Sequence, residues 1–296
     1  PAGDLTAASA GKNPGPAVLV LPGRARYGRA VLREVPETVT ALLPYLAALL
    51  LAGSFAGILA GLLGVGGGIV LVPAFVAILT AAGYGGPDMM QICLATSLAT
   101  IFVTSIRSVL AHHRKGAVEW QILRLWAPWI MLGAMAGVWL VSRLGTRELQ
   151  LIFAVLVFVV ASYMLFSRAE WRLAETPPTG ARRAGMAGTI GLVGVLLGIG
   201  GGSLGVPMLT LHGRPIHRAV ATAAGFGAVI ALPSVLSFLF VPARAAPPGT
   251  VGSVNLPMFG IVIAMTLLTA PLGATLAHGA NPRLLKRLLL FLMAVR

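Results

Sequence analysis

Charged residues are scarce in this chain. They make up 10% of the 296 residues, while hydrophobic residues make up 57% and the mean hydropathy is +0.90. Soluble domains usually carry about 25% charged residues, because their surfaces must be hydrated. A soluble fold of this length cannot hide so much apolar surface, so the composition predicts an integral membrane protein.

Acidic residues are the rarer sign of charge. There are eight of them, and all fall in the N-terminal tail, in loops or at the ends of apolar runs: Asp4, Glu34, Glu37, Asp88, Glu119, Glu148, Glu170 and Glu175. Cation pumps and proton relays generally need a carboxylate inside the membrane. The absence of one there disfavours transport of cations.

The residues needed for catalysis or metal binding are also missing. Cys93 is the single cysteine, so neither an intrachain disulfide nor a cysteine cluster can form. The sequence has no H-E-x-x-H motif, and no histidine base is convincingly placed to activate the serine of Gly202-Ser203. We therefore expect no enzymatic activity, no cofactor and no metal.

A net charge of +14 could suggest nucleic-acid binding. The Lys and Arg residues instead flank apolar runs, where they set membrane topology and contact lipid headgroups. We therefore expect the lipid bilayer as a partner and exclude nucleic acid. Residues 1–37 form a polar, basic tail.

Ten apolar segments follow the tail. Each is expected to be helical, because a helix satisfies its own backbone hydrogen bonds in lipid. Two segments, 69–82 and 203–211, are too short for a perpendicular crossing and are expected to be broken or re-entrant helices. The segments are 38–63, 69–82, 89–111, 125–142, 148–166, 184–199, 203–211, 217–241, 254–278 and 284–295.

The two halves of the chain repeat one motif. GLLGVGGGIVLVP from Gly61 aligns without a gap with VLLGIGGGSLGVP from Val195, at an offset of 134. Weaker matches extend the duplication, including Ala95-Thr96 with Ala221-Thr222. The predicted architecture is all-α, with a first membrane repeat at 38–166, a cytoplasmic linker at 167–183 and a second repeat at 184–296.

The distribution of basic residues predicts the topology. If the first helix starts outside, twelve Lys and Arg residues lie in cytoplasmic loops and three, Arg143, Arg147 and Arg244, lie outside. Each repeat then crosses the membrane an odd number of times. The repeats must be inverted, an arrangement that places a substrate site near the midplane.

Each glycine triplet is expected to unwind its helix and to expose backbone N–H groups at the start of the next one. Such a helix N-terminus attracts anions. The alternative is that the glycines only permit close helix packing; their duplication favours a site. The candidate residues on these segments are Gly66, Gly67, Gly68, Ile69, Gly200, Gly201, Gly202 and Ser203.

Hydroxyl groups on the neighbouring segments could replace water around an anion. Thr96, Ser97 and Thr222 are candidates, although Ser and Thr in membrane helices often bond back to their own helix. Arg107 is a further candidate, and its alternative role is to reach the membrane surface by snorkelling.

Taken together, GLLGVGGGIVLVP, LATSLATIFVTSIRSVLAHHRKGAVEW and GIGGGSLGVP resemble the TauE/SafE family over roughly residues 45–296. The resemblance implies a multi-pass carrier in the bacterial inner membrane that exports sulfite, sulfoacetate or a related organosulfonate. We expect alternating access at a midplane site, with a channel for small inorganic anions as the alternative. Assembly into a homo-oligomer is left open.

Overall fold

The computed structural model describes residues 42–60, 67–166 and 172–279. The chain divides into two compact units, 1–44 and 45–296, and almost all described residues belong to the second. The basic tail at 1–37 and the expected segment 284–295 lie outside the described residues. The number of ten segments therefore stays a prediction.

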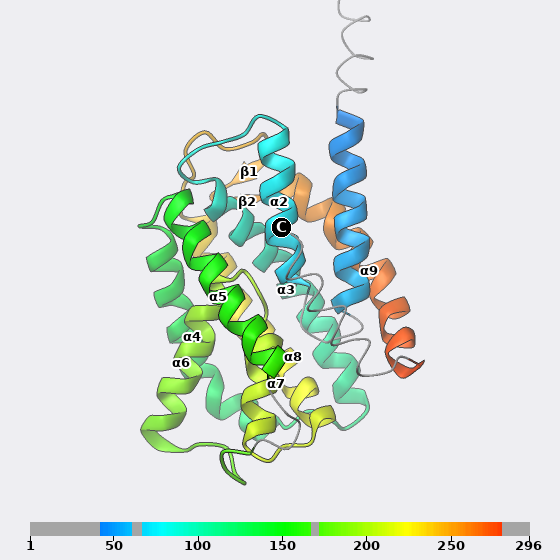
Figure 1. Cartoon of the computed structure of the whole chain (residues 1–296), viewed down its shortest axis with the longest axis vertical. Helices are drawn as coiled ribbons and strands as arrows, with labels where there is room; N and C mark the ends of the chain where they lie inside the picture. The colour runs from blue at the N-terminus through cyan, green and yellow to red at the C-terminus, as the bar shows by residue number, and fades with distance from the viewer. Residues whose placement is uncertain (1–41, 61–66, 167–171, 280–296) are drawn as a thin grey trace, which may run out of the picture. The chain divides into compact units, whose positions relative to one another are not determined.

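The described chain is almost entirely helical, as the sequence predicted. A helix at Leu42–Ala60 precedes the labelled elements of Figure 1. The labelled helices are α2 (Gly68–Ala81), α3 (Met89–Arg114), α4 (Trp120–Val141), α5 (Thr146–Phe166), α6 (Gly180–Leu196), α7 (Gly202–Leu211), α8 (Ile216–Leu239) and α9 (Leu256–Gly279). Helix α6 begins before residue 184, where the second repeat was expected to start.

A small β-hairpin departs from the all-α prediction. Strands β1 (Thr250–Val251) and β2 (Val254–Asn255) pair antiparallel, with Thr250 opposite Asn255. Gly252 in the turn has a φ of 59°, a left-handed conformation that glycine adopts without a steric penalty. The apolar run from 254 concealed this hairpin, because Val254 and Asn255 precede α9 without any break in composition.

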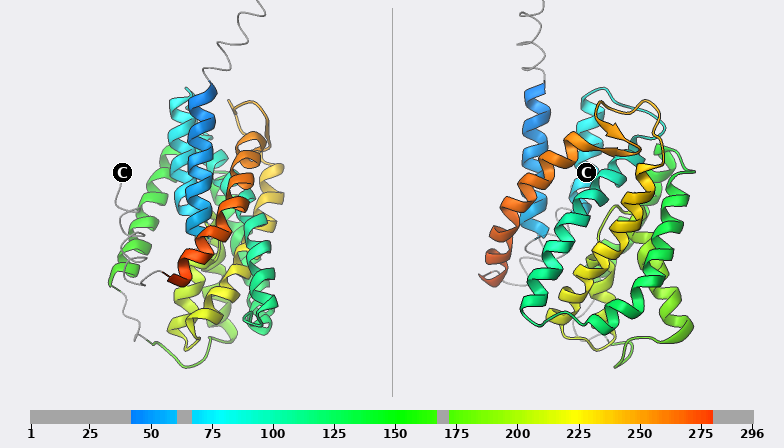
Figure 2. Two further views of the ribbon diagram at one scale, coloured as in Figure 1. Left: turned by 90° about the vertical axis from the view of Figure 1, so that its right-hand side faces the viewer. Right: turned by 180° about the vertical axis from the view of Figure 1, so that it is seen from behind.

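Among the described residues, five helices are long and apolar enough to cross a membrane: Leu42–Ala60, α3, α4, the part of α5 at Thr146–Tyr163, and α8. Over an apolar stretch of 18 consecutive residues in each helix, 78% of the residues are buried in α3 and 67% in α8, but only 11% in α5. Helices α3 and α8 therefore form the centre of unit 45–296, and much of α5 is left facing outward (Figures 1 and 2).

Small residues allow the outer helices to pack closely. An added Cβ at Gly57 would strike Thr269 of α9, and one at Gly133 of α4 would strike the carbonyl of Gly188 in α6. Within lipid, helices associate largely through such close backbone approaches. These contacts hold α9 and α4 at fixed positions beside Leu42–Ala60 and α6.

The loops gather at two opposite ends of the unit. The hairpin face carries the β-hairpin and the loop before α3, where Thr146 Oγ1 donates to the carbonyls of Gly86 and Pro87. The basic face carries the loop between α3 and α4 and the residues between α7 and α8. There the backbone N–H of Leu173, in the linker, donates to the carbonyl of Leu211 at the end of α7 (Figure 1).

Candidate functional site

Helices α2 and α7 both begin inside the unit, away from its two faces. The Cβ position of Gly68, the first residue of α2, lies against the carbonyl oxygen of Gly198. The preceding residue, Gly67, has a φ of 70°, which explains why glycine stands there. Ser97 Oγ of α3 donates to the same Gly198 carbonyl at 2.8 Å. The segments that contain the two glycine motifs therefore meet beside α3.

The second triplet packs into the centre formed by α3 and α8. A Cβ on Gly200 would lie 3.1 Å from Ile101, and one on Gly201 would strike Phe226. Gly227, halfway along α8, completes the contact, because its Cβ position is filled by Ser105 Oγ. These contacts support the alternative interpretation of the triplets, in which the glycines permit close helix packing.

Ser203 is the polar side chain that this packing leaves unpaired. It lies in the first turn of α7 and is 4% exposed, and its Oγ has no hydrogen-bond partner among the described residues. A buried hydroxyl without a partner costs about 1–3 kcal/mol. Backbone N–H groups of a first helical turn also lack partners within the helix. The start of α7 thus combines an unused hydroxyl with the positive end of a helix dipole.

The hydroxyls of Thr96 and Thr222 each accept a backbone N–H from the other half of the chain. Thr222 Oγ1 accepts the backbone N–H of Glu119, just before α4, and Thr96 Oγ1 accepts the backbone N–H of Asn255, just before α9, both at 3.0 Å. Each hydroxyl therefore satisfies the start of a helix from the other half. Thr96 and Thr222 are buried, whereas the first residues of α4 and α9, Trp120 and Leu256, are exposed, so α4 begins at the basic face and α9 at the hairpin face.

The remaining candidate site residues are Arg107, Ile69 and Gly66. Arg107 lies on an exposed face of α3, whereas Ile101 of the same helix contacts Gly200. Ile69 is half-buried and packs with Leu197 and Ile199, as an ordinary core residue would. Gly66 lies outside the described residues.

Sequence reasoning missed one charged cluster on the basic face. Glu119 Oε2 lies 3.5 Å from Arg214 Nε, and Glu119 Oε1 lies 4.0 Å from Arg218 Nη1. The Glu119 side chain is 13% exposed. The sequence placed all three residues in cytoplasmic loops or at segment ends, and nothing in their spacing indicated that they meet.

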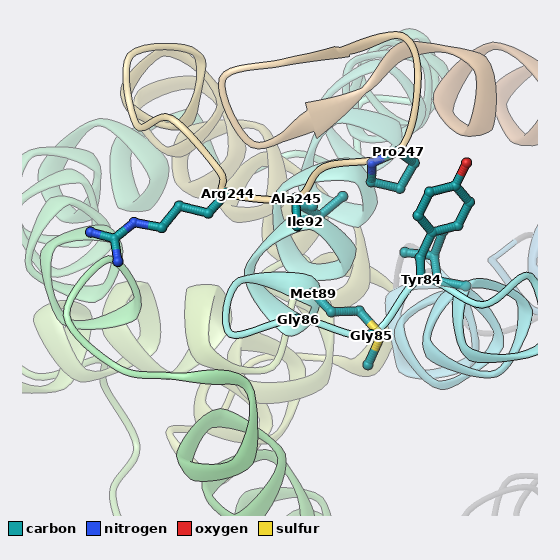
Figure 3. Close-up of a pocket in the computed structure, with 9 residues that line it drawn as sticks. Tyr84, Gly85, Gly86, Met89, Ile92, Arg244, Ala245 and Pro247 are labelled. Carbon is teal, nitrogen blue, oxygen red and sulfur yellow. The ribbon is translucent and has the colours of Figure 1, made fainter.

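A shallow pocket opens on the hairpin face (Figure 3). Its lining includes Tyr84, Met89 and Pro247, together with Arg244, whose side chain extends away from Tyr84. The backbone N–H of Arg244 donates to Asp88 Oδ2 at 2.7 Å, which fixes the loop over α3. This pocket belongs to the end of the unit and holds none of the residues around Ser203. Within the described ranges, no three His, Cys, Asp or Glu residues are grouped as metal ligands.

Comparisons with known proteins indicate a membrane transporter. The model of the family described as sulfite exporter TauE/SafE matches residues 49–295. A probable membrane transporter protein of Haemophilus influenzae is 34% identical over 76% of this chain and 86% of its own length. A probable membrane transporter protein of Methanocaldococcus jannaschii is 25% identical over 83% of this chain and 92% of its own. No solved structure matches.

Proposed function

Because the chain belongs to the sulfite exporter TauE/SafE family, which makes it a membrane transporter, we propose that it exports a small sulfur-containing anion by alternating access. The substrate class we propose is sulfite, sulfoacetate or a related organosulfonate. The observation that carries the proposal is the start of α7, where the unpaired Ser203 hydroxyl lies at a buried helix N-terminus.

The charge distribution of the centre favours an anion. Helices α2 and α7 both begin inside the unit, and a helix N-terminus carries about half a positive unit charge. The described carboxylates lie at or near the two faces, so none opposes this field at the start of α7. A sulfonate group offers several acceptor oxygens to the N–H groups of α7 and to Ser203.

The exchange of hydrogen bonds between the halves supports inverted repeats. Thr222 lies near the start of α8 and contacts the start of α4, which follows the end of α3. Thr96 lies near the start of α3 and contacts the start of α9, which follows the end of α8. The equivalent helices α3 and α8 thus run in opposite directions, as inversion of the repeats requires.

Transport requires movement at the glycines. The Cβ positions of Gly68 and Gly201 are occupied by Gly198 and Phe226, so an anion can reach Ser203 only when α7 separates from α8. Helix α7 leads from this junction to the basic face, and α2 leads from it to the hairpin face. Separation at one end and then at the other would give alternating access.

The test is counterflow exchange in proteoliposomes. The full-length protein is loaded with unlabelled sulfite or sulfoacetate, and the accumulation of labelled anion is measured against sulfate and acetate. A carrier of the proposed class accumulates label only when the matching anion is inside. Conductance without exchange would instead identify an anion channel, and the absence of any flux of these anions would reject the proposed substrates.

We place the protein as a multi-pass protein of a bacterial inner membrane, with the basic face toward the cytoplasm. The positive-inside bias of the loops supports this orientation. An exporter oriented in this way takes up its anion from the basic face, where Arg214 and Arg218 lie.

A further inference from the structure

The cluster of Glu119, Arg214 and Arg218, called the basic-face cluster below, has an excess of one positive charge. Its two ion pairs measure 3.5 and 4.0 Å, which is longer than a charge-assisted hydrogen bond. Glu119 Oε1 and Arg214 Nε are buried without a hydrogen-bond partner among the residues that the structure describes. The Glu119 carboxylate is therefore largely buried and incompletely satisfied, whereas the two arginine side chains are partly open to solvent, so the cluster is a weak one.

The cluster connects the two halves of the protein at the entrance to the proposed site. Glu119 immediately precedes α4, whereas Arg214 and Arg218 lie at the junction of α7 and α8. From Arg218, two turns of α8 lead to Phe226, whose Cβ contacts the Gly201 position. The arginines therefore lie at the end of the α7–α8 pair that faces the basic face, two turns of α8 from the Gly201 contact.

Arginine suits an oxyanion at this position. Its planar guanidinium donates two parallel hydrogen bonds to a carboxylate or a similar oxyanion. The Glu119 carboxylate offers the same chemistry from within the chain, but it makes neither bond at hydrogen-bonding distance. The arginines retain unused donors, and one side of the cluster is open, since the Arg218 side chain is 58% exposed.

We propose that Arg214 and Arg218 form a recruitment site for the transported oxyanion on the basic face, and that Glu119 is the internal competitor that occupies it in the resting protein. This proposal rests on the proposed function and specifies where its substrate first binds. An arriving sulfite or sulfonate replaces the Glu119 carboxylate on Arg214. The replacement breaks the side-chain link between Arg214, which follows α7, and the start of α4, while the hydrogen bond from the Glu119 N–H to Thr222 of α8 remains.

The test is binding of sulfite and sulfoacetate to the purified full-length protein in nanodiscs, measured by calorimetry. Glu119→Gln should tighten binding severalfold, because it removes the competitor. Arg214→Gln should weaken binding about tenfold, the loss expected for a charged hydrogen bond. Arg218→Gln should weaken it less, because that side chain is more exposed. Arg172→Gln, an exposed linker residue, is the control for an equal change of net charge.

The double variant separates recruitment from a structural role. If Glu119 competes for Arg214, Glu119→Gln should tighten binding much less when Arg214 is already Gln. Arg214→Lys keeps the positive charge but lacks the planar guanidinium, so it should bind the anion with intermediate affinity. It also keeps the inference testable if Arg214→Gln fails to fold. Melting temperatures establish that each variant is folded.

The inference is overturned if Glu119→Gln weakens binding or leaves it unchanged, or if Arg214→Gln behaves like Arg172→Gln. Its failure is distinguishable from that of the proposed function. A wild type that binds and exchanges these anions, with no difference among the cluster variants, rejects the recruitment site alone. A wild type that binds neither anion rejects the proposed function and, with it, this inference.

Discussion

The hydroxyl of Thr222 accepts the backbone N–H of Glu119 at 3.0 Å, although 103 residues separate them in the chain. Thr96 and Asn255 repeat the relationship at the same distance across 159 residues. The N–H group that precedes each helix has no partner within that helix. Each half of the chain therefore supplies the hydroxyl that completes a helix start in the other half.

Thr222→Val should destabilise the protein without changing its affinity for an anion. The substitution leaves the partly buried N–H of Glu119 without its partner, at a cost of about 1 kcal/mol. Thr222→Ser keeps the hydroxyl and is the control. The measurements are thermal unfolding and sulfite binding in detergent. If Thr222→Val instead lowers the affinity for sulfite at unchanged stability, the Thr222 hydroxyl is part of the substrate site.

Ser203→Ala should have the opposite effect. Removal of an unpaired buried hydroxyl stabilises the fold or leaves it unchanged, whereas transport falls by about tenfold if that hydroxyl bonds the anion. Ser234→Ala is the control, because Ser234 is equally buried but bonds back to the carbonyl of Ile230. Counterflow rates and melting temperatures are compared. Unchanged transport in Ser203→Ala would exclude this hydroxyl as a ligand.

Gly201→Ala should destabilise the protein by about 1–3 kcal/mol, because the new methyl group strikes the backbone and Cβ of Phe226. Gly85→Ala is the control, since no atom lies within 4 Å of its Cβ position. Denaturation curves measure the difference. Equal stability of the two variants would show that α7 and α8 are not packed together as described. Larger substitutions at Gly201 cannot test transport, because they disturb folding first.

A cysteine at position 115 should react with an impermeant thiol reagent only from the cytoplasm. Lys115 is exposed on the basic face, and the neighbouring Gly116 is less suitable because its φ is 64°. Gly85→Cys on the hairpin face should react only from outside. Both variants carry Cys93→Ala to remove the single native thiol. Labelling of position 115 from outside would invert the proposed topology.

The glycine motifs illustrate what local sequence could predict about the site. Three consecutive glycines interrupt a helix whatever surrounds them, so the starts of α7 near Ser203 and of α2 near Gly68 were expected almost at the observed residues. The sequence could not predict that Gly68 lies against Gly198, because this contact joins two segments far apart in the chain. The sequence favoured a binding site over packing, and the structure shows that described glycines of both triplets do pack closely.

The sequence by itself determined that the chain is a helical membrane protein, because long apolar runs in lipid must satisfy their backbone hydrogen bonds within each helix. Only the tertiary structure decided which polar groups are free. Thr96 and Thr222 accept N–H groups that precede helices, Ser203 Oγ has no partner among the described residues, and Glu119 lies beside Arg214. Hydrogen bonds between distant segments depend on how α3 and α8 pack, and no local pattern of residues specifies that.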